Sequence, residues 1–187
     1  MTDYEQQLLA RVERDPEAFR ELYQRYFPRV FAYVAYRVRR REDAEDVVGE
    51  VFMQIVRGLS QFEYRGDGSF AAWVFRIAHN QVNQFYRRNR LETEPVPLDD
   101  LPEIQAHHLA PDGVLARKEQ FAHLSALIAD LPQRRREIVT LRFFGGLRNQ
   151  EIARVLELDE RTVASHLSRA LGDLRRSYQP EEGTRYE

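Results

Sequence analysis

The chain has 187 residues, of which 43% are hydrophobic and 31% charged, and its formal net charge is −2. This composition predicts one or two folded domains. No apolar run approaches the ~20 residues that span a bilayer, and the N-terminus is polar and acidic, so we expect a cytoplasmic protein without membrane contact of its own. The absence of cysteine excludes disulfides and thiolate metal sites within the chain.

The first ninety residues show helical periodicity and no strand pattern. Asp15 followed by Pro16 indicates a helix start, and apolar residues recur at helical spacing behind this pair. We expect Pro28 to break or kink that helix, with a second segment continuing to about Val38.

A third helix is predicted from Glu42 to Leu59, because its apolar residues form one stripe. The opposite face is polar and carries Glu45, Asp46, Glu50 and Gln54. Asp43, Asp46 and Glu50 share a face, so a metal-dependent nuclease site is one interpretation. No histidine or distant carboxylate is positioned to complete such a site, and we favour an acidic face that docks a basic protein partner.

A loop with turn residues Gly66 and Gly68 precedes a fourth helix, predicted at about Phe70–Arg88. This helix combines aromatic residues, four amides and a basic end, which together are typical of a single-strand nucleic-acid binder. The amides are Asn80, Gln81, Asn83 and Gln84. They are poor helix formers, so we expect them to face solvent or a ligand, whereas Trp73 is better explained as a core residue.

An acidic strip follows, since residues 91–116 contain six acidic residues and no Lys or Arg, between two mildly basic segments. Four of the eight prolines lie in this strip: Pro95, Pro97, Pro102 and Pro111. These features predict an extended linker. We therefore expect an all-α protein with small helical domains at residues 1–90 and 115–178, a flexible acidic linker at 91–114 and a frayed tail at 179–187.

Helices resume at about 115–130 and 133–144, and residues 149–170 then form two short apolar stripes joined by a sharp turn. This spacing predicts a helix-turn-helix in which Leu158 fills the gap and Asp159 caps the second helix. The exposed face of that helix can donate hydrogen bonds to phosphates and bases through Arg161, Thr162, Ser165, His166, Ser168 and Arg169. On this pattern alone, a plain helical hairpin with a solvated face is the alternative.

The sequence has no Walker loop, no GxGxxG and no nucleophile-base pattern. His107 and His108 lie in the linker, where solvated loop residues are the default. We therefore expect no catalytic activity, no cofactor and no metal site.

Three motifs in this order resemble the extracytoplasmic-function (ECF, group IV) sigma factors of bacterial RNA polymerase, within the sigma-70 family. DAEDVVGEVF at Asp43–Phe52 is similar to region 2.2, Phe70–Arg88 to regions 2.3 and 2.4, and Leu131–Leu171 to region 4. The resemblance covers nearly all of the chain.

The resemblance implies a subunit that binds core RNA polymerase, through the β′ clamp helices and the β flap, and directs promoter-specific transcription initiation. The implied polymerase-binding residues are Asp43, Glu45, Asp46, Glu50 and Gln54. The melted, single-stranded minus-ten element would meet Phe62, Arg65, Arg76, Asn80, Asn83, Gln84, Arg87 and Arg88. The duplex minus-thirty-five element of the promoter DNA would meet Asn149, Gln150, Arg161, Thr162, Ser165, His166, Ser168 and Arg169. An anti-sigma factor would control the chain.

Five positions depart from the family pattern. Gly49 stands where the family usually has Gln, Gln84 where Asp is common, Ala164 where Arg or Lys is frequent, Glu157 where Gly is frequent, and Arg148 where a capping Ser is usual. We expect the fold and polymerase binding to carry over, but not a familiar minus-thirty-five sequence. The alternative function is a dimeric helix-turn-helix regulator of duplex DNA, although a long linker suits fixed half-site spacing poorly.

Overall fold

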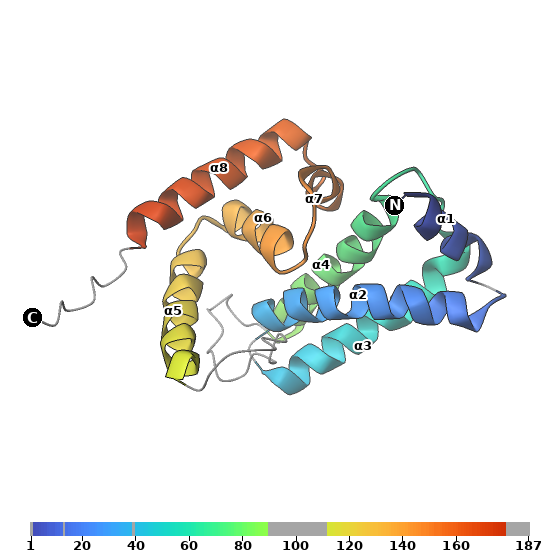
Figure 1. Cartoon of the computed structure of the whole chain (residues 1–187), viewed down its shortest axis with the longest axis horizontal. Helices are drawn as coiled ribbons and strands as arrows, with labels where there is room; N and C mark the ends of the chain where they lie inside the picture. Colours follow the sequence, from blue (N-terminus) through green and yellow to red (C-terminus); the bar gives the residue numbers. More distant parts are fainter. Residues whose placement is uncertain (1, 13, 39, 90–111, 179–187) are drawn as a thin grey trace, which may run out of the picture.

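The computed structural model describes residues 2–12, 14–38, 40–89 and 112–178, and the elements in these ranges are all helical (Figure 1). In chain order they are α1 (Thr2–Arg11), α2 (Pro16–Arg37), α3 (Arg41–Gly58), the 3-10 helix η1 (Leu59–Gln61), α4 (Ser69–Asn89), α5 (Asp112–Ala129), α6 (Gln133–Phe143), α7 (Asn149–Leu156) and α8 (Glu160–Ser177). The predicted all-α class is confirmed for these residues. Most of the predicted linker and the predicted frayed tail lie outside them, so the flexibility of both stays a prediction.

The predicted start of α2 is confirmed. Of the two outcomes expected at Pro28, a break is wrong and a kink stays a prediction. The Asp15 carboxylate accepts a hydrogen bond from the Glu17 backbone N–H at 3.0 Å and caps the helix. The helix then continues through Pro28 as one element. Pro28 is exposed, whereas the residues on the opposite side, Tyr26 and Val30, are buried. Burial of that face outweighs the backbone hydrogen bond that proline removes.

Helix α1 was not anticipated from the sequence. Leu8 is fully buried, and the buried Glu5 carboxylate accepts a hydrogen bond from the Tyr26 hydroxyl of α2. Burial raises the pKa of Tyr26 well above its usual range, with a further contribution from the Glu5 hydrogen bond. The phenol therefore stays protonated and donates to Glu5, which fixes α1 on α2.

Helices α2, α3 and α4 build the core of the first half. The apolar stripe of α3 is buried as predicted, with Val51 fully inaccessible. Tyr33 of α2 and Phe75 of α4 meet edge to face, with ring centroids 5.8 Å apart. The opposite, acidic face of α3 is thereby directed to solvent.

The predicted helix-turn-helix is confirmed as α7 and α8. Ile152 and Val163 are fully buried, and Leu158 in the turn packs against the core. The Asp159 carboxylate accepts a hydrogen bond from the Thr162 backbone N–H at 2.8 Å, which is the predicted cap.

The two halves of the chain form one body, a point that the sequence leaves open. Helix α7 packs against α4, and α6 packs against α2 (Figure 1). The apolar core of the first half extends without interruption to Ile138, Leu147 and Ile152 of the second half. The predicted domains are therefore in direct contact along a shared apolar core.

Glu157, at the end of α7, is the one described non-glycine residue with a positive φ, 56°. A left-handed conformation costs an L-residue roughly 1–2 kcal/mol, and glycine avoids this cost at an entropic cost of its own. We expect Glu157→Gly to raise the free energy of unfolding by about 0.5–1 kcal/mol, measured by urea denaturation. Glu157→Ala is the matched control, because it removes the same side chain and keeps the Cβ. Equal stabilisation by both variants would contradict the backbone explanation.

Candidate nucleic-acid interface

The exposed face of α8 presents hydrogen-bond donors as predicted. Arg161, Ser165, Ser168 and Arg169 are exposed, and Ala164 lies exposed among them. Thr162 and His166, also predicted on this face, are partly buried. The Thr162 hydroxyl donates to Asp159 at 2.5 Å, and its hydrogen bonds hold the pKa of Asp159 below the usual range. Thr162 therefore belongs first to the helix cap.

The N-terminus of α7 carries two further predicted contacts. Gln150 is exposed, whereas Asn149 is partly buried and its side-chain oxygen has no hydrogen-bond partner among the described residues. Arg148 holds the N-cap position, where Ser, Thr, Asp or Asn would satisfy a helix N–H, and an arginine side chain has no acceptor to offer. Only the other half of the capping box is formed: the Glu151 carboxylate accepts a hydrogen bond from the Arg148 backbone N–H at 2.7 Å.

A pocket of about 610 Å³ lies between the loop before α4, the first turns of α4, and α7. Its lining residues are Gln61, Phe62, Glu63, Arg65, Ser69, Ala72, Trp73, Arg76 and Arg154. Phe62 and Trp73 form its aromatic wall, with ring centroids 5.0 Å apart. Trp73 is only partly buried, so it contributes both to the core and to the pocket. The predicted minus-ten residues Phe62, Arg65 and Arg76 are thus brought together.

The remaining predicted residues of α4 differ in exposure. Asn80, Arg87 and Arg88 are exposed, whereas Asn83 and Gln84 are partly buried. Gln81 is only 8% exposed, so the expectation that all four amides face outward is wrong for this residue. Its position on the inner side of α4, one turn from buried residues on that face, explains the difference.

Asn83 contacts a histidine. Its side-chain nitrogen lies 2.9 Å from His79 Nε2, and the Tyr33 hydroxyl lies 3.2 Å from His79 Nδ1. Burial lowers the pKa of His79; Glu137 opposes this shift, whereas Arg37 and Arg134 reinforce it. A neutral His79 therefore fixes Asn83 from within the helix, and the amide cluster is in part structural.

The acidic face of α3 is accessible. Glu45, Asp46, Glu50 and Gln54 are exposed, and Asp43 is partly buried. Glu45 forms an ion pair with Arg41 at 2.8 Å. Within the described ranges, no three His, Cys, Asp or Glu side chains are grouped so that they could hold a metal ion. A nuclease interpretation would need a metal site, and the described residues supply no further metal ligand beside the acids of α3.

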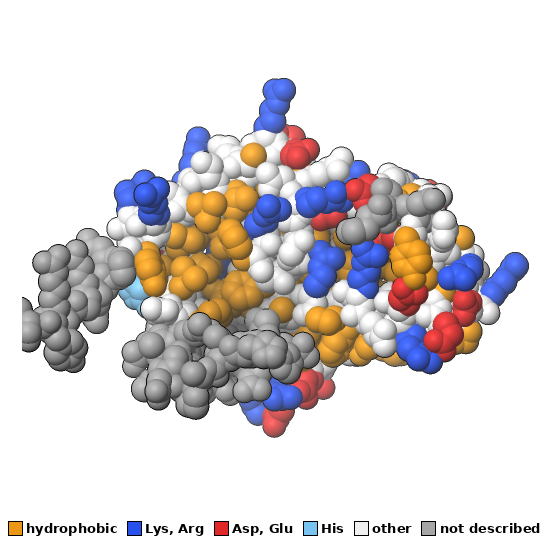
Figure 2. Space-filling view, in the orientation of Figure 1, with side chains coloured by type: hydrophobic (Ala, Val, Ile, Leu, Met, Phe, Trp, Pro, Cys, Tyr) orange, Lys and Arg blue, Asp and Glu red, His pale blue; other side chains and the backbone are white. Residues whose placement is uncertain are grey.

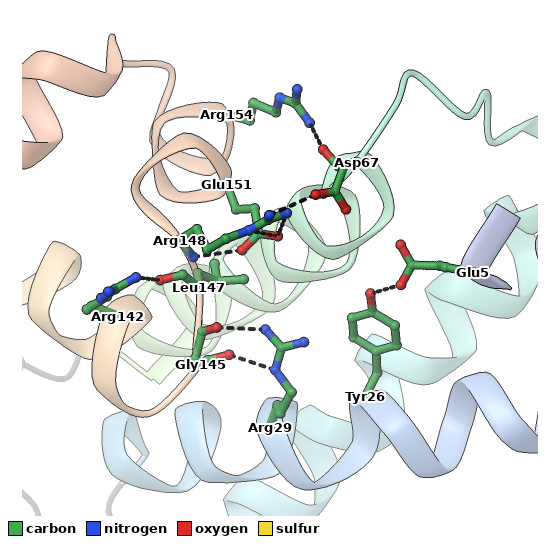
Figure 3. Close-up of polar contacts among 11 residues, drawn as sticks. Glu5, Tyr26, Arg29, Asp67, Arg142, Gly145, Leu147, Arg148, Glu151 and Arg154 are labelled. Atoms are coloured by element: carbon green, nitrogen blue, oxygen red, sulfur yellow. Dashed lines mark hydrogen bonds and ion pairs between the residues drawn. The ribbon is translucent and has the colours of Figure 1, made fainter. Parts of the chain in front are cut away.

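Several arginines connect the two halves of the molecule, and one of them, Arg154, also lines the pocket (Figure 3). Arg148 Nη1 donates to the Asp67 carboxylate at 2.7 Å, and Arg154 Nη1 donates to the Asp67 carbonyl oxygen at 3.0 Å. Arg29 of α2 donates to the carbonyl oxygens of Gly145 and Gly146 at 3.0 and 3.1 Å. The Arg148 hydrogen bond lowers the pKa of Asp67, which therefore stays ionised at neutral pH.

Sequence reasoning missed these contacts. Arg148 was singled out only as a replacement for a capping residue, and Gly68 only as a turn residue. Gly68 and Arg148 are neighbours in the structure. A Cβ on Gly68 would lie 2.7 Å from Glu151 Oε1 and 3.0 Å from an Arg148 nitrogen, so the Arg148–Glu151 pair occupies the space beside this glycine. Basic side chains gather on the surface over this junction of α4, α7 and the preceding loop (Figure 2).

Comparison with known proteins agrees with this architecture. Residues 22–92 match the family model described as Sigma-70 region 2, and residues 122–174 match Sigma-70, region 4. None of the described helices is long and apolar enough to cross a membrane.

Curated relatives extend the match to nearly the whole chain. It is 32% identical to RNA polymerase sigma-H factor of Pseudomonas aeruginosa over 95% of each protein. It is 30% identical to ECF RNA polymerase sigma-E factor of Escherichia coli over 94% of this chain and 95% of that protein. The ECF RNA polymerase sigma factor BldN of Streptomyces coelicolor is 33% identical over 87% of this chain, which spans only 61% of BldN.

Two solved structures share the fold. CnrH in complex with the cytosolic domain of CnrY superposes with a TM-score of 0.60 at 23% identity, covering 90% of this chain and 93% of that one. RpoE in complex with the anti-sigma factor NepR from Bartonella quintana gives 0.61 at 22% identity, covering 85% and 95%. The two family models and the curated relatives show that the chain belongs to the ECF sigma factors of the sigma-70 family, DNA-binding factors of transcription initiation. This membership favours a sigma factor over a dimeric regulator.

The partly buried His79 generates a prediction about acid stability. Because its pKa is lower in the folded chain than in the unfolded one, the unfolded chain takes up the proton first as the pH falls. The free energy of unfolding should therefore be fully retained above about pH 6.5 and should decline below it. We expect this decline, measured by urea denaturation between pH 7 and pH 5, to be smaller in His79→Gln. The exposed His123 provides the control His123→Gln, and equal declines in all three proteins would contradict the assignment.

Proposed function

We propose that this sigma factor binds core RNA polymerase and directs it to promoters whose minus-thirty-five element is read as duplex and whose minus-ten element is read as a melted single strand. One observation supports the proposal most: a single chain presents two chemically different surfaces, each of a kind that suits a nucleic acid. Region 2 (α2–α4) supplies the aromatic wall and two arginines of a pocket that Arg154 of region 4 completes, and region 4 (α5–α8) has a helix face lined by donors.

The pocket suits an unpaired base. Phe62 and Trp73 offer aromatic faces, on which stacking contributes about 1–3 kcal/mol per base. Arg65 and Arg76 at the pocket, with Arg87 and Arg88 farther along α4, supply positive charge along one path for the phosphate backbone. The exposed Asn80 can read a base edge between them.

The face of α8 suits the major groove. Its N-terminal turn follows the Asp159 cap, and in a helix-turn-helix the N-terminal residues of the second helix contact base edges. Arg169 can bind guanine through two hydrogen bonds, and Ala164 can contact a thymine methyl group. Since Ala164 cannot donate a hydrogen bond, we propose that the minus-thirty-five sequence differs from those read by relatives with a basic residue there.

The acidic face of α3 would dock on the β′ clamp helices, and region 4 would contact the β flap. Both contacts follow from membership of the family, and the exposure of Glu45, Asp46 and Glu50 supports the first. Control by an anti-sigma factor is also proposed. Two relatives of the same fold were solved in complexes, RpoE with the anti-sigma factor NepR and CnrH with CnrY, which supports this partner class.

Run-off transcription with core polymerase and fragments of the source genome tests the main proposal. We expect new start sites with the wild-type chain, and we expect Arg169→Ala to weaken binding to those promoters by about 1–3 kcal/mol if the arginine holds a base. Arg176→Ala is the control, because Arg176 is exposed on the same helix and pairs with Asp173. A chain that shifts duplex DNA alone but gives no new start sites would contradict the sigma proposal.

Asp46→Arg tests the docking face. Reversal of an exposed charge on α3 should weaken association with core polymerase at least several-fold in co-purification, because opposed charges at an interface set both affinity and encounter rate. Glu17→Arg makes the same charge change on an exposed position of α2. Equal retention of both variants by the polymerase would remove α3 from the docking surface.

A further inference from the structure

Gly49 is a glycine that the fold itself does not require. It lies in the middle of α3 at an exposed position and, unlike Gly66 and Gly68, has no positive φ. Glycine in a helix interior lowers helix stability relative to alanine. A Cβ on Gly49 would meet no described neighbour within 4 Å, so the missing side chain relieves no contact inside this part of the chain. A local rule broken without an internal reason points to a contact outside the fold.

Gly49 divides one face of α3 into two unlike halves. Residues three, four or seven positions apart lie on the same side of a helix. Glu42 and Asp46 therefore precede Gly49 on this face, and Met53 and Val56 follow it. We call these five residues the outer face of α3. It is acidic before Gly49 and apolar after it.

The outer face has no partner within the described part of the chain. α3 packs on α2 and α4 through its opposite, buried side (Figure 1). Met53 and Val56 are 50% and 51% exposed. Glu42 forms an ion pair with Arg40, whereas Asp46 forms none with a described residue. Apolar side chains and a charge are thus both available to another molecule.

The apolar half of the outer face continues onto α2. Phe52 lies one turn before Val56, and its ring meets the exposed ring of Tyr23 at a centroid distance of 4.7 Å. Scattered exposed apolar residues are ordinary on a protein surface, but a contiguous exposed patch beside charges marks an interaction site.

The shape and chemistry of the outer face fit a helical partner. From Glu42 to Val56 it is about 21 Å long, which is the length of about four turns of a second helix. A helix with basic residues opposite Asp46 and apolar residues opposite Met53 and Val56 would complement both halves. Packed helix axes lie about 8–10 Å apart, and glycine at the contact permits the shorter distance.

We propose that Gly49 is the point at which a helix of core RNA polymerase crosses α3, in close contact with the bare backbone there. The proposal rests on the proposed function, because the acidic half belongs to the face proposed to dock on the β′ clamp helices. It adds Met53 and Val56 to that docking surface and gives Gly49 a role. α3 gives up helix stability at this position and gains a closer contact with its partner.

Two measurements on the full-length chain separate docking from folding. The chain has no cysteine, so Gln7→Cys, at an exposed position of α1, provides a single site for a fluorescent dye. The anisotropy of this dye during titration with core polymerase gives the Kd. Thermal unfolding gives the Tm of each variant.

We expect Gly49→Ala to raise the Tm by roughly 2–4 °C, because alanine favours the helix and meets no described neighbour. The same variant should bind core polymerase about three- to tenfold more weakly, because its methyl group holds the two helices apart. Gly49→Leu should weaken binding more than about tenfold, although leucine adds apolar surface.

Gly172→Ala is the matched control. Gly172 lies in the interior of α8, and a Cβ there would be in ordinary contact with Arg176 at 3.6 Å. This variant should raise the Tm by a similar amount and leave binding to the polymerase unchanged.

Met53→Ser tests the apolar half. It should weaken binding about three- to tenfold, because a half-exposed methionine would no longer be buried by the partner, and the Tm should stay the same.

Each other result overturns a distinct statement. A higher Tm with unchanged binding in Gly49→Ala, when Asp46→Arg still weakens association, would overturn the crossing and leave the docking face intact. Tighter binding by Gly49→Leu would mean that the face needs apolar area and not close approach, which also overturns the crossing. A lower Tm in Gly49→Ala would attribute weaker binding to folding and overturn the role of Gly49. Unchanged binding by Met53→Ser would remove the apolar half. Undiminished binding by Asp46→Arg as well would overturn the proposed docking face, and the crossing with it.

Discussion

The packing of α7 against α4 is the contact on which the arrangement of this sigma factor depends. It joins Ile152 and Leu147 of region 4 to the core of region 2, so that two family regions share one apolar interior. An apolar interface of this kind is strong because it removes apolar surface area from water, but the hydrophobic effect does not fix the orientation of the two partners. The polar contacts around it, from Arg29 to the Gly145 carbonyl and from Arg148 to Asp67, fix the register.

Local elements could be predicted from the sequence because their signals are local. The Asp15 and Asp159 caps, the α3 stripe and the turn at Leu158 each follow from residues within one or two helical turns. The continuous α2 could not be predicted, because what holds the helix together past Pro28 is burial against partners distant in sequence. The same limit explains why the buried side of Gln81 was missed.

Several residues of the candidate site could be predicted from the sequence, but the way the fold brings them together could not. Phe62, Arg65 and Arg76 do line one pocket, yet Arg154 completes it from the other half of the chain. No periodicity within α7 can show that an arginine there meets a loop so far away in sequence. Arg148, an unusual residue for the N-cap of α7, was the one local sign of a contact outside that helix.

Tyr36 has a consequence for the solubility of the chain. It comes from region 2, yet it completes the small apolar cluster of region 4 with Val139, Ile128 and Leu174. Apolar side chains also gather on the surface between α5, α6 and α8 (Figure 2). Without Tyr36, Phe144 would be uncovered, and a wider apolar surface would favour self-association. The stacking of Tyr36 on Phe144 therefore also keeps apolar surface of region 4 covered.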